Sequence, residues 1–542
     1  MRLLRRITVA VASVNLLSPT LASANNVSDS LPVVDLGYGL YRASKLEFNS
    51  NGGYYNFSNI RYAAAPVGNL RFRAPESPAI NHSVINDGSF DRICPQSFGS
   101  WGVTNGSNFG GRDPRENEDC LFLDIVVPKK VFGNADQGHR SPVIVWIHGG
   151  AFTLGSKTFF ANPDRLIERS TTNCSDGVIW VAINYRLGAF GFLSGPTLQE
   201  DGTPNAGLHD QRFALKWVQD NIHLFGGDKN RVTVLGESAG AASIMHQMTA
   251  YGGSPCKDLF QQVIPQSPGW YPSLSVQSQE QTFRDFLSAA GVGSLAEARI
   301  LTSEQLISAN ARQVAGSPFG RFTYGPAVDG SFVTQDPKEL LNRGQFDKSV
   351  RIMVGHNADE GLIFTPPTLT SDTDFDSYVQ SIVPDAKPDV IDHITNTLYP
   401  SVQNGTSAPY NNTYSRAAFF VGELVFTCNS FALDVASQNE PYAYIFAVGA
   451  GHHGDDLAYT FYDPKQEENG SGFNATVALV LQDYITSFAV RGVPDSLVDG
   501  LSAFPLFGKN ASVVRLEMDS IGVARDPAAN DRCRWWMQGH YH

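Results

Sequence analysis

Short apolar runs rich in β-branched residues recur along the chain, and each ends in a loop of small residues. The runs at 142–147, 232–235 and 352–354 have the length and composition of buried strands. Between the first and the second of these strands, the segment 205–225 repeats apolar residues on one face of a predicted helix. This alternation over 56–270 predicts an α/β fold with a large, mostly parallel central sheet flanked by helices.

Two helix-rich stretches, 271–350 and 365–440, follow this alternation, and residues 25–55 carry the turn and strand residues of an N-terminal β-segment. The chain of 542 residues is long for one average domain, but large α/β enzymes form one continuous sheet at this size. We therefore expect a single domain spanning 25–542. The content of 42% hydrophobic and 17% charged residues is ample for its core.

The strand predicted at 232–235 runs into the sequence GESAG, which places Ser238 in a Gly-x-Ser-x-Gly frame. A serine on a sharp strand-to-helix turn needs small residues two positions before and after it, and Gly236 and Gly240 supply them. A serine between glycines is more often part of a solvated loop. The strand before it and the small-residue helix after it favour a nucleophile elbow.

The strand predicted at 142–147 ends in the glycine-rich loop HGGAF at 148–152. Such a loop can offer backbone N–H groups to the oxyanion of a tetrahedral intermediate. We expect Gly150, Ala151 and Ala239 to be the donors of this oxyanion hole.

Two loops offer the remaining groups of a catalytic triad. The loop after the strand at 352–354 contains Asp359 and Glu360, and either could orient a histidine. A later loop of small residues contains His452 and His453, either of which could be the base. The order serine, acid, histidine is the order of α/β-hydrolases, and it favours catalysis over two exposed loop histidines.

The chain resembles the type-B carboxylesterase/lipase family, which contains cholinesterases, mammalian carboxylesterases and many secreted fungal lipases and esterases. The resemblance runs from about residue 60 to residue 536 and rests on several separate motifs. These are IRYAAAPVGNLRF at 60–72, EDCLFLDI at 118–125, WIHGGAF at 146–152, NYRLGAFG at 184–191, the serine motif, and the acid and histidine loops. The resemblance implies an α/β-hydrolase fold with helical cap-like insertions.

The same resemblance resolves the two ambiguities of the triad. The family's acid loop ends in Asp-Glu-Gly, which implies Glu360, and its histidine precedes Gly-x-(Glu/Asp)-(Leu/Ile), which implies His453. The family's oxyanion positions fall on Gly150, Ala151 and Ala239. The resemblance also implies disulfides from Cys94 to Cys120 and from Cys428 to Cys533; Cys174 and Cys256 would then pair only by elimination.

One position departs from the cholinesterase pattern. Cholinesterases place a tryptophan ten residues before the second cysteine of the first disulfide loop, where its ring attracts a quaternary ammonium. Counting back from Cys120 reaches Gly110, and Trp101 lies elsewhere in the same loop. The sequence therefore argues against specificity for choline esters.

Charge and composition limit the classes of partner that the protein is expected to bind. The net charge is −13 and no basic block occurs, which argues against nucleic acid as a partner. No Cys-x-x-Cys spacing suggests a metal site, and triad chemistry needs no cofactor. The expected partner is a small-molecule or lipid ester.

The N-terminus has the form of a secretory signal. Residues 1–24 contain a basic start, an apolar stretch and small residues that end at Ala24, which predicts a mature start near Asn25. The apolar stretch is too short to span a bilayer, no later run reaches the required length, and the polar tail excludes a GPI signal. If the host is eukaryotic, glycans are expected at the sequons of Asn26, Asn56, Asn81, Asn105, Asn173, Asn404, Asn411, Asn469, Asn474 and Asn510.

These observations predict a secreted serine hydrolase of carboxylic esters that forms an acyl-enzyme on Ser238. The alternatives are an acyltransferase or a tailoring enzyme for esters of secreted secondary metabolites, and a triglyceride lipase. A non-catalytic binding protein of the same fold is disfavoured, because Ser238, Glu360 and His453 are all present.

Overall fold

The computed structural model describes residues 31–49, 52–101, 113–171, 175–253, 258–272, 275–402, 409–438, 440–464 and 473–541. The predicted signal at 1–24, Gly110, Cys174 and Cys256 lie outside the described residues. The sequons at Asn26, Asn105, Asn173, Asn404 and Asn469 lie outside them as well.

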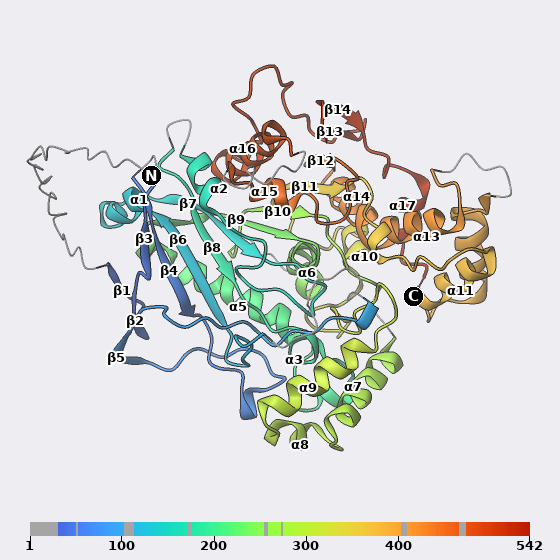
Figure 1. The fold of residues 1–542 in the computed structure, drawn as a ribbon, viewed down its shortest axis with the longest axis horizontal. Helices are drawn as coiled ribbons and strands as arrows, with labels where there is room; N and C mark the ends of the chain where they lie inside the picture. Colours follow the sequence, from blue (N-terminus) through green and yellow to red (C-terminus); the bar gives the residue numbers. More distant parts are fainter. Residues whose placement is uncertain are drawn as a thin grey trace, which may run out of the picture.

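An 11-stranded mixed sheet forms the centre of the molecule (Figure 1). From one edge to the other its strands are β14 (Ile521–Arg525), β13 (Ser512–Glu517), β12 (Tyr442–Ala447), β11 (Arg351–Asn357), β10 (Gln262–Gln266), β9 (Gly227–Glu237), β7 (Ser141–Ile147), β8 (Ile179–Ile183), β6 (Phe122–Pro128), β4 (Tyr54–Arg61) and β3 (Lys45–Glu47). The strands from β13 to β8 in this order are parallel, and both edges are antiparallel. The predicted α/β fold with a mostly parallel centre is confirmed.

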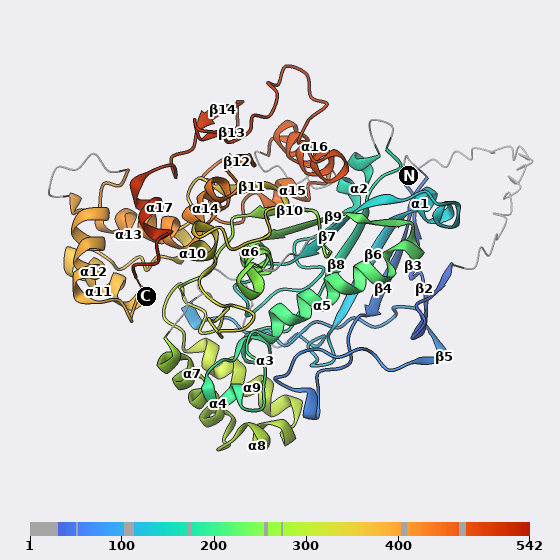
Figure 2. The ribbon, with the colours of Figure 1, turned by 180° about the vertical axis from the view of Figure 1, so that it is seen from behind.

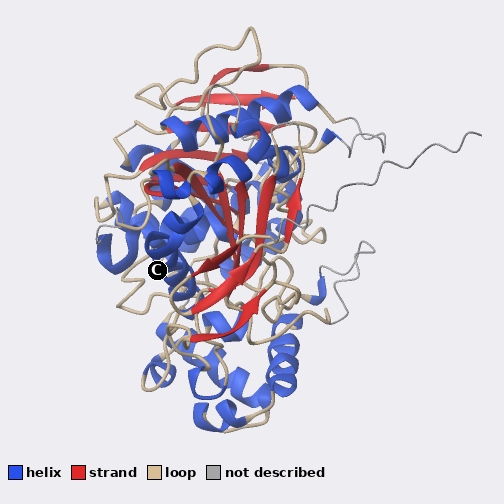
Figure 3. Ribbon diagram, turned by 90° about the vertical axis from the view of Figure 1, so that its left-hand side faces the viewer, coloured by secondary structure: helices blue, strands red, loops and turns tan. Residues whose placement is uncertain are grey.

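Side chains of the central strands point alternately into two hydrophobic cores, one on each face of the sheet. In β7, Val143, Val145 and Ile147 belong to one core, whereas Ile144 and Trp146 belong to the other. This alternation follows from the two-residue period of a strand, and it explains why a strand buried on both faces reads as a continuous apolar run. Figure 3 shows the strands passing between helices on both sides.

Helices cover both faces of this sheet and extend beyond it (Figures 1 and 2). Their bounds are α1 (Lys129–Gly133), α2 (Asp164–Ser170), α3 (Gly188–Phe192), α4 (Pro196–Gln199), α5 (Ala206–Asn221), α6 (Ala239–Gly253), α7 (Val276–Ala290), α8 (Leu295–Ile300), α9 (Ser303–Ala315), α10 (Pro337–Asn342), α11 (Asp372–Ile382), α12 (Pro388–His393), α13 (Thr413–Gly422), α14 (Cys428–Ala436), α15 (Leu457–Thr460), α16 (Ala475–Arg491) and α17 (Asp531–Trp536). Residues of α5 and α6 belong to the first core and residues of α2 and α16 to the second. The helices α7 to α14 occupy the two stretches that the sequence predicts to be helix-rich.

The predicted helix at 205–225 is α5 followed by a short 3₁₀ turn, η4 (Ile222–Phe225). Its apolar face is buried, and Leu208 is fully enclosed. Two charged residues of α5 make structural pairs: Asp210 forms a buried ion pair with Arg186 at 2.7 Å, and Lys216 pairs on the surface with Asp220.

Three further features complete the fold. A small separate sheet contains β1 (Val33–Asp35), β2 (Gly39–Arg42) and β5 (Asn81–Asn86), so the N-terminal β-segment is present. Disulfides join Cys94 to Cys120 and Cys428 to Cys533. The helical stretch Thr413–Ala436, which includes the π-helical turn η8 (Glu423–Thr427), has the length and apolar composition of a membrane span. This corrects the expectation that no later run is long enough; 83% of its apolar window is buried, as in a core helix.

Candidate active site

Ser238 lies on the turn between the end of β9 and the start of α6, at the carboxyl edge of the parallel strands. Its φ is +55°, a strained value for a residue with a side chain. Three backbone hydrogen bonds hold the turn: Ser238 N–H donates to Gln266 O at 2.9 Å, and Ser238 O accepts from Ala242 N–H and Gly269 N–H. The turn therefore presents the Ser238 side chain in a fixed direction.

Close packing explains why glycine stands on both sides of this turn. A Cβ at Gly240 would lie 2.0 Å from Ile147 O at the end of β7, and a Cβ at Gly236 would lie 2.7 Å from Gly240 C. Backbone atoms cannot move away as flexible side chains can. The Gly-x-Ser-x-Gly frame is thus a packing requirement at this site.

A chain of hydrogen bonds connects Ser238, His453 and Glu360. His453 Nε2 lies 2.8 Å from Ser238 Oγ, and His453 Nδ1 lies 2.5 Å from Glu360 Oε2. Glu360 is 2% exposed, and its other oxygen accepts a hydrogen bond from Asn357 N–H at the end of β11. The three residues come from loops that follow β9, β11 and β12, so the parallel strands bring them to one edge of the sheet.

The neighbouring alternatives are placed differently. Asp359 N–H donates to Gly451 O, and Asp359 forms an isolated β-bridge with His452. His452 N–H donates to Asp455 at 2.8 Å. Neither Asp359 nor His452 hydrogen bonds to Ser238 in the described part of the chain, whereas His453 does.

Electrostatic and aromatic neighbours define the state of His453. Burial opposes protonation of the imidazole, but the carboxylates of Glu360 and Glu237 outweigh it and raise the pKa of His453 above its ordinary value. The rings of Phe364 and Phe426 lie 5.2 Å and 4.2 Å from the imidazole and limit its contact with water.

Glu237 is a functional candidate that the sequence reasoning missed. Its Oε1 lies 3.3 Å from His453 Nε2, and burial raises the pKa of the Glu237 carboxyl above its ordinary value. Its position directly before Ser238 was the available signal. A second buried carboxyl, Asp456, accepts hydrogen bonds from Gln266 and Asn357, and burial raises the pKa of Asp456 to about 6.

The glycine-rich loop after β7 places free backbone donors beside the serine. Gly150 and Ala151 have φ values of +103° and +52°, and their N–H groups donate to no acceptor among the described residues. Ala239 is the first residue of α6, so its N–H has no partner within the helix. Gly150, Ala151 and Ser238 line the same cavity. These are the donors that the sequence predicts for an oxyanion hole.

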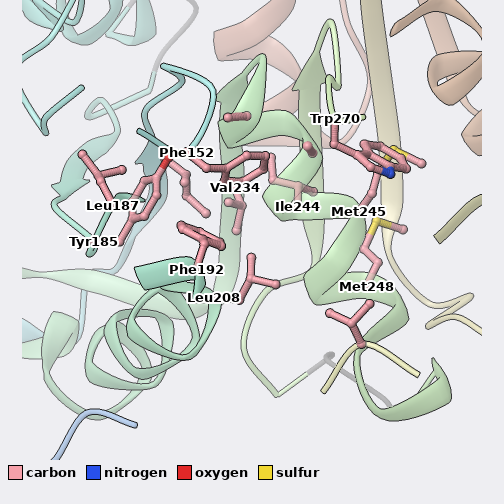
Figure 4. Packing of buried hydrophobic residues seen from close by; sticks show 14 of the residues in the cluster. Phe152, Tyr185, Leu187, Phe192, Leu208, Val234, Ile244, Met245, Met248 and Trp270 are labelled. Atoms are coloured by element: carbon pink, nitrogen blue, oxygen red, sulfur yellow. The ribbon is translucent and has the colours of Figure 1, made fainter. Parts of the chain in front are cut away.

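Two cavities meet at Ser238. The larger, of about 960 Å³, is also lined by His453, Glu237, Trp101 and Phe160. The smaller, of about 110 Å³, is lined mostly by apolar groups that include Phe152, Phe192 and Trp270. Figure 4 shows these three side chains among the packed residues of the first hydrophobic core. Over the described residues, no group of three or more His, Cys, Asp or Glu side chains is arranged to hold a metal ion.

The described sequons differ in accessibility. Asn81, Asn411 and Asn510 are exposed, whereas Asn56 and Asn474 are half-buried. Asn474 also caps α16, because its side-chain oxygen accepts from the N–H groups of Thr476 and Val477.

Comparison with known proteins identifies the family. The sequence model of the carboxylesterase family matches residues 30–536. The chain is 40% identical to carboxylesterase patB of Penicillium expansum, over 94% of this chain and 96% of that protein. It is 29% identical to a secreted lipase of Arthroderma benhamiae, over 87% of this chain and 83% of that protein.

Solved structures show the same relationship. The crystal structure of Aspergillus niger EstA superimposes with a TM-score of 0.79 and 25% identity, over 93% of this chain and 98% of that chain. The chain has a serine at the strand-to-helix turn of an α/β-hydrolase sheet, and it matches esterases over nearly its whole length. The chain therefore belongs to the carboxylesterase family and is a carboxylic ester hydrolase.

Proposed function

We propose that the chain is a secreted serine esterase that cleaves carboxylic esters through an acyl-enzyme on Ser238. The observation that carries the proposal is the unbroken chain of hydrogen bonds from Ser238 Oγ through His453 to Glu360, at the point where both cavities meet. The nucleophile and the orienting acid are each within hydrogen-bond reach of the base, which is the geometric requirement for this chemistry.

Each residue of the site has a defined role in the proposed reaction. His453 removes the proton of Ser238 as the serine oxygen attacks the ester carbonyl, and Glu360 holds the imidazole in the required tautomer. The N–H groups of Gly150, Ala151 and Ala239 stabilise the oxyanion, and loss of one such donor typically costs ~3 kcal/mol of barrier. His453 then returns the proton to the leaving alcohol, and water activated by the same histidine hydrolyses the acyl-enzyme.

Three observations support export of the chain. The segment 1–24 has the form of a secretory signal, two disulfides join distant parts of the chain, and one relative is named a secreted lipase. Exposed sequons at Asn81, Asn411 and Asn510 are the described positions best placed to carry glycans. We propose in addition that residues 25–542 fold as one domain, because a single sheet connects both hydrophobic cores.

A triglyceride lipase is the second candidate. Phe160 lines the larger cavity and is 62% exposed, and Ile363, in the same cavity, is 45% exposed. Such apolar side chains at a cavity mouth suit a lipid substrate, and several relatives are named lipases. An acyltransferase or an ester-tailoring enzyme would use the same acyl-enzyme and differ only in the acceptor or the alcohol.

One set of assays distinguishes these functions. We would measure kcat/KM for p-nitrophenyl esters of increasing acyl length and for emulsified triglyceride, with and without an added alcohol acceptor. Release of free acid from short esters supports the esterase, preference for the emulsion supports the lipase, and acyl transfer to the alcohol in place of water supports the transferase. Folded Ser238→Ala should lose several orders of magnitude in kcat; if it retains wild-type activity, the mechanism is wrong.

A further inference from the structure

Arg321 is the single charged side chain that lines the smaller cavity beside Ser238, as far as the described residues show. It lies on the loop between α9 and α10, and its backbone is fixed on both sides. Arg321 N–H donates to Pro318 O at 2.9 Å, and Arg321 O accepts a hydrogen bond from Trp101 Nε1 at 3.2 Å. The side chain is half-buried, and burial lowers the pKa of its guanidinium.

The Arg321 guanidinium has no carboxylate partner among the described residues. Nη1 donates one hydrogen bond to Ser381 O, and Cζ lies 5.2 Å from the centroid of the Tyr271 ring. A guanidinium has five N–H donors in a planar fork. Most of these donors therefore have no protein acceptor among the described residues, although partly buried charges are normally paired.

Tyr271 provides a second unused polar group at the same cavity. Its hydroxyl is buried and has no hydrogen-bond partner among the described residues, and burial raises the pKa of the Tyr271 phenol above its ordinary value. A buried hydroxyl without a partner is destabilising and is usually explained by a ligand or an ion. Arg321 and Tyr271 both line the smaller cavity, and no acidic side chain of the described residues lines it.

We propose that Arg321 and Tyr271 bind a free carboxylate on the acyl part of the substrate, so that the preferred esters are monoesters of short dicarboxylic acids. The proposal rests on the proposed function, in which Ser238 is the nucleophile. A carboxylate can accept two parallel hydrogen bonds from a guanidinium and a further one from a phenol. It would supply the acceptors that both side chains lack.

The division of the two cavities assigns the carboxylate to the acyl side. The leaving alcohol must receive its proton from His453, and His453 lines the larger cavity but not the smaller one. The acyl group then extends into the smaller cavity, where Phe152 and Trp270 offer apolar contacts to a short spacer. The larger cavity contains the carboxylates of Glu237 and Asp455, which would repel an anionic alcohol.

The test compares esters that differ only in this charge. We would measure kcat/KM for the monoethyl esters of succinic, glutaric and adipic acids and for their uncharged amide counterparts, such as ethyl glutaramate. The wild-type enzyme should prefer at least one acid ester over its amide by tenfold or more. Because charge-assisted hydrogen bonds are strong, Arg321→Gln should lower kcat/KM for that acid ester by ~10–100-fold while changing its amide less than ~3-fold.

Further variants separate binding from folding. Tyr271→Phe should lower the preference for the acid ester by ~3–10-fold, and Arg321→Lys should retain part of it, because the charge remains but the planar fork is lost. Arg284→Gln is the charge-matched control, since Arg284 lies on α7, is 67% exposed and does not line either cavity. Thermal unfolding of each variant shows whether it is folded.

The possible results are distinct. A wild-type enzyme that hydrolyses p-nitrophenyl butyrate but shows no preference for any acid ester would overturn the carboxylate site and leave the esterase intact. If Arg321→Gln lowers kcat/KM equally for the acid ester and for its uncharged amide counterpart, the carboxylate site is overturned as well. If the wild type hydrolyses no ester, the proposed function itself fails, and the carboxylate site fails with it. If Arg321→Gln does not fold, competitive inhibition of the wild type by glutarate, weakened in Tyr271→Phe, decides the question.

Discussion

Glu237 Oε1 lies 3.3 Å from His453 Nε2, the same nitrogen that faces Ser238 Oγ at 2.8 Å. The imidazole is therefore bordered by two buried carboxylates, Glu360 at Nδ1 and Glu237 at Nε2. Both favour the protonated imidazole, which forms when the serine gives up its proton. The arrangement stabilises the charge that develops on His453 during the proposed attack. It also keeps the His453 imidazole of the substrate-free enzyme protonated up to a higher pH.

The first prediction concerns the pH profile. The neutral imidazole is the base, so kcat/KM should fall as the pH drops through the pKa of His453. Because neighbouring carboxylates raise this pKa, the acidic limb of the wild type should lie above pH ~6.5, the ordinary value for histidine. Glu237→Gln removes one carboxylate and should move the limb to lower pH by ~1 unit.

The control for this measurement is Glu47→Gln, because Glu47 pairs with Lys45 on the surface and its removal changes the net charge equally. Its pH profile should match that of the wild type. An unchanged limb in Glu237→Gln would mean that Glu237 is already neutral when His453 titrates.

The second prediction separates the adjacent histidines. His453→Ala should lose several orders of magnitude in kcat, because His453 alone connects Ser238 to Glu360. His452→Ala should keep most of the activity, since the His452 backbone, which is unchanged by the substitution, makes the hydrogen bond to Asp455. Steady-state kinetics with one p-nitrophenyl ester are sufficient, and the opposite pattern would reverse the assignment of the base.

The elements around the triad were predictable because their signals are local. Short β-branched runs predict β7 and the centre of β9. The glycine two positions after Ser238 predicts a tight turn, and the structure shows that a Cβ at Gly240 would collide with Ile147 O. The full length of β9 was not predictable, since its polar first residues, 227–231, resemble a turn. They belong to the strand because Gly227 pairs with Ser141 across a register shift.

Contacts between segments far apart in the chain could not be predicted from the sequence. Residues 359 and 360 both carry a carboxyl group, and the folded chain distinguishes them: Asp359 bridges to His452, whereas the buried Glu360 lies 2.5 Å from His453 Nδ1. The unused donors of Arg321 and Tyr271 have no sequence signal, because a missing partner becomes visible only when the surrounding chain is folded.

The third prediction concerns the nucleophile turn. A methyl group at Gly240 would lie 2.0 Å from Ile147 O, so Gly240→Ala forces β7 and α6 apart. We expect a loss of ~3 kcal/mol or more in the free energy of unfolding, at the upper end for overpacked sites, and a fall in kcat as Ser238 moves. Gly133→Ala is the matched control, because a Cβ at Gly133 meets no atom within 4 Å. Equal stability of the two variants in urea unfolding would refute the packing argument.

The last prediction concerns choline esters. Gly110 stands where a cholinesterase has its tryptophan, and Trp101, which does line the larger cavity, is surrounded by other rings. The centroid of the Trp101 ring lies 5.0 to 5.3 Å from the ring centroids of Phe98, Phe319 and Phe322. Trp101 Nε1 donates a hydrogen bond to Arg321 O. Little of its face is therefore available to a quaternary ammonium, whose attraction to a free ring contributes ~1–2 kcal/mol.

Butyrylcholine should consequently be hydrolysed with a kcat/KM no higher than that of an uncharged butyrate ester with a similar leaving group. The comparison needs low and high salt, because the net charge of −13 attracts any cation at long range and salt screens that attraction. A preference for choline that disappears in high salt would be steering by the whole protein. A preference that persists in high salt and is lost in Trp101→Ala would contradict the prediction and make Trp101 the ammonium site, since only a direct contact with the ring is insensitive to screening.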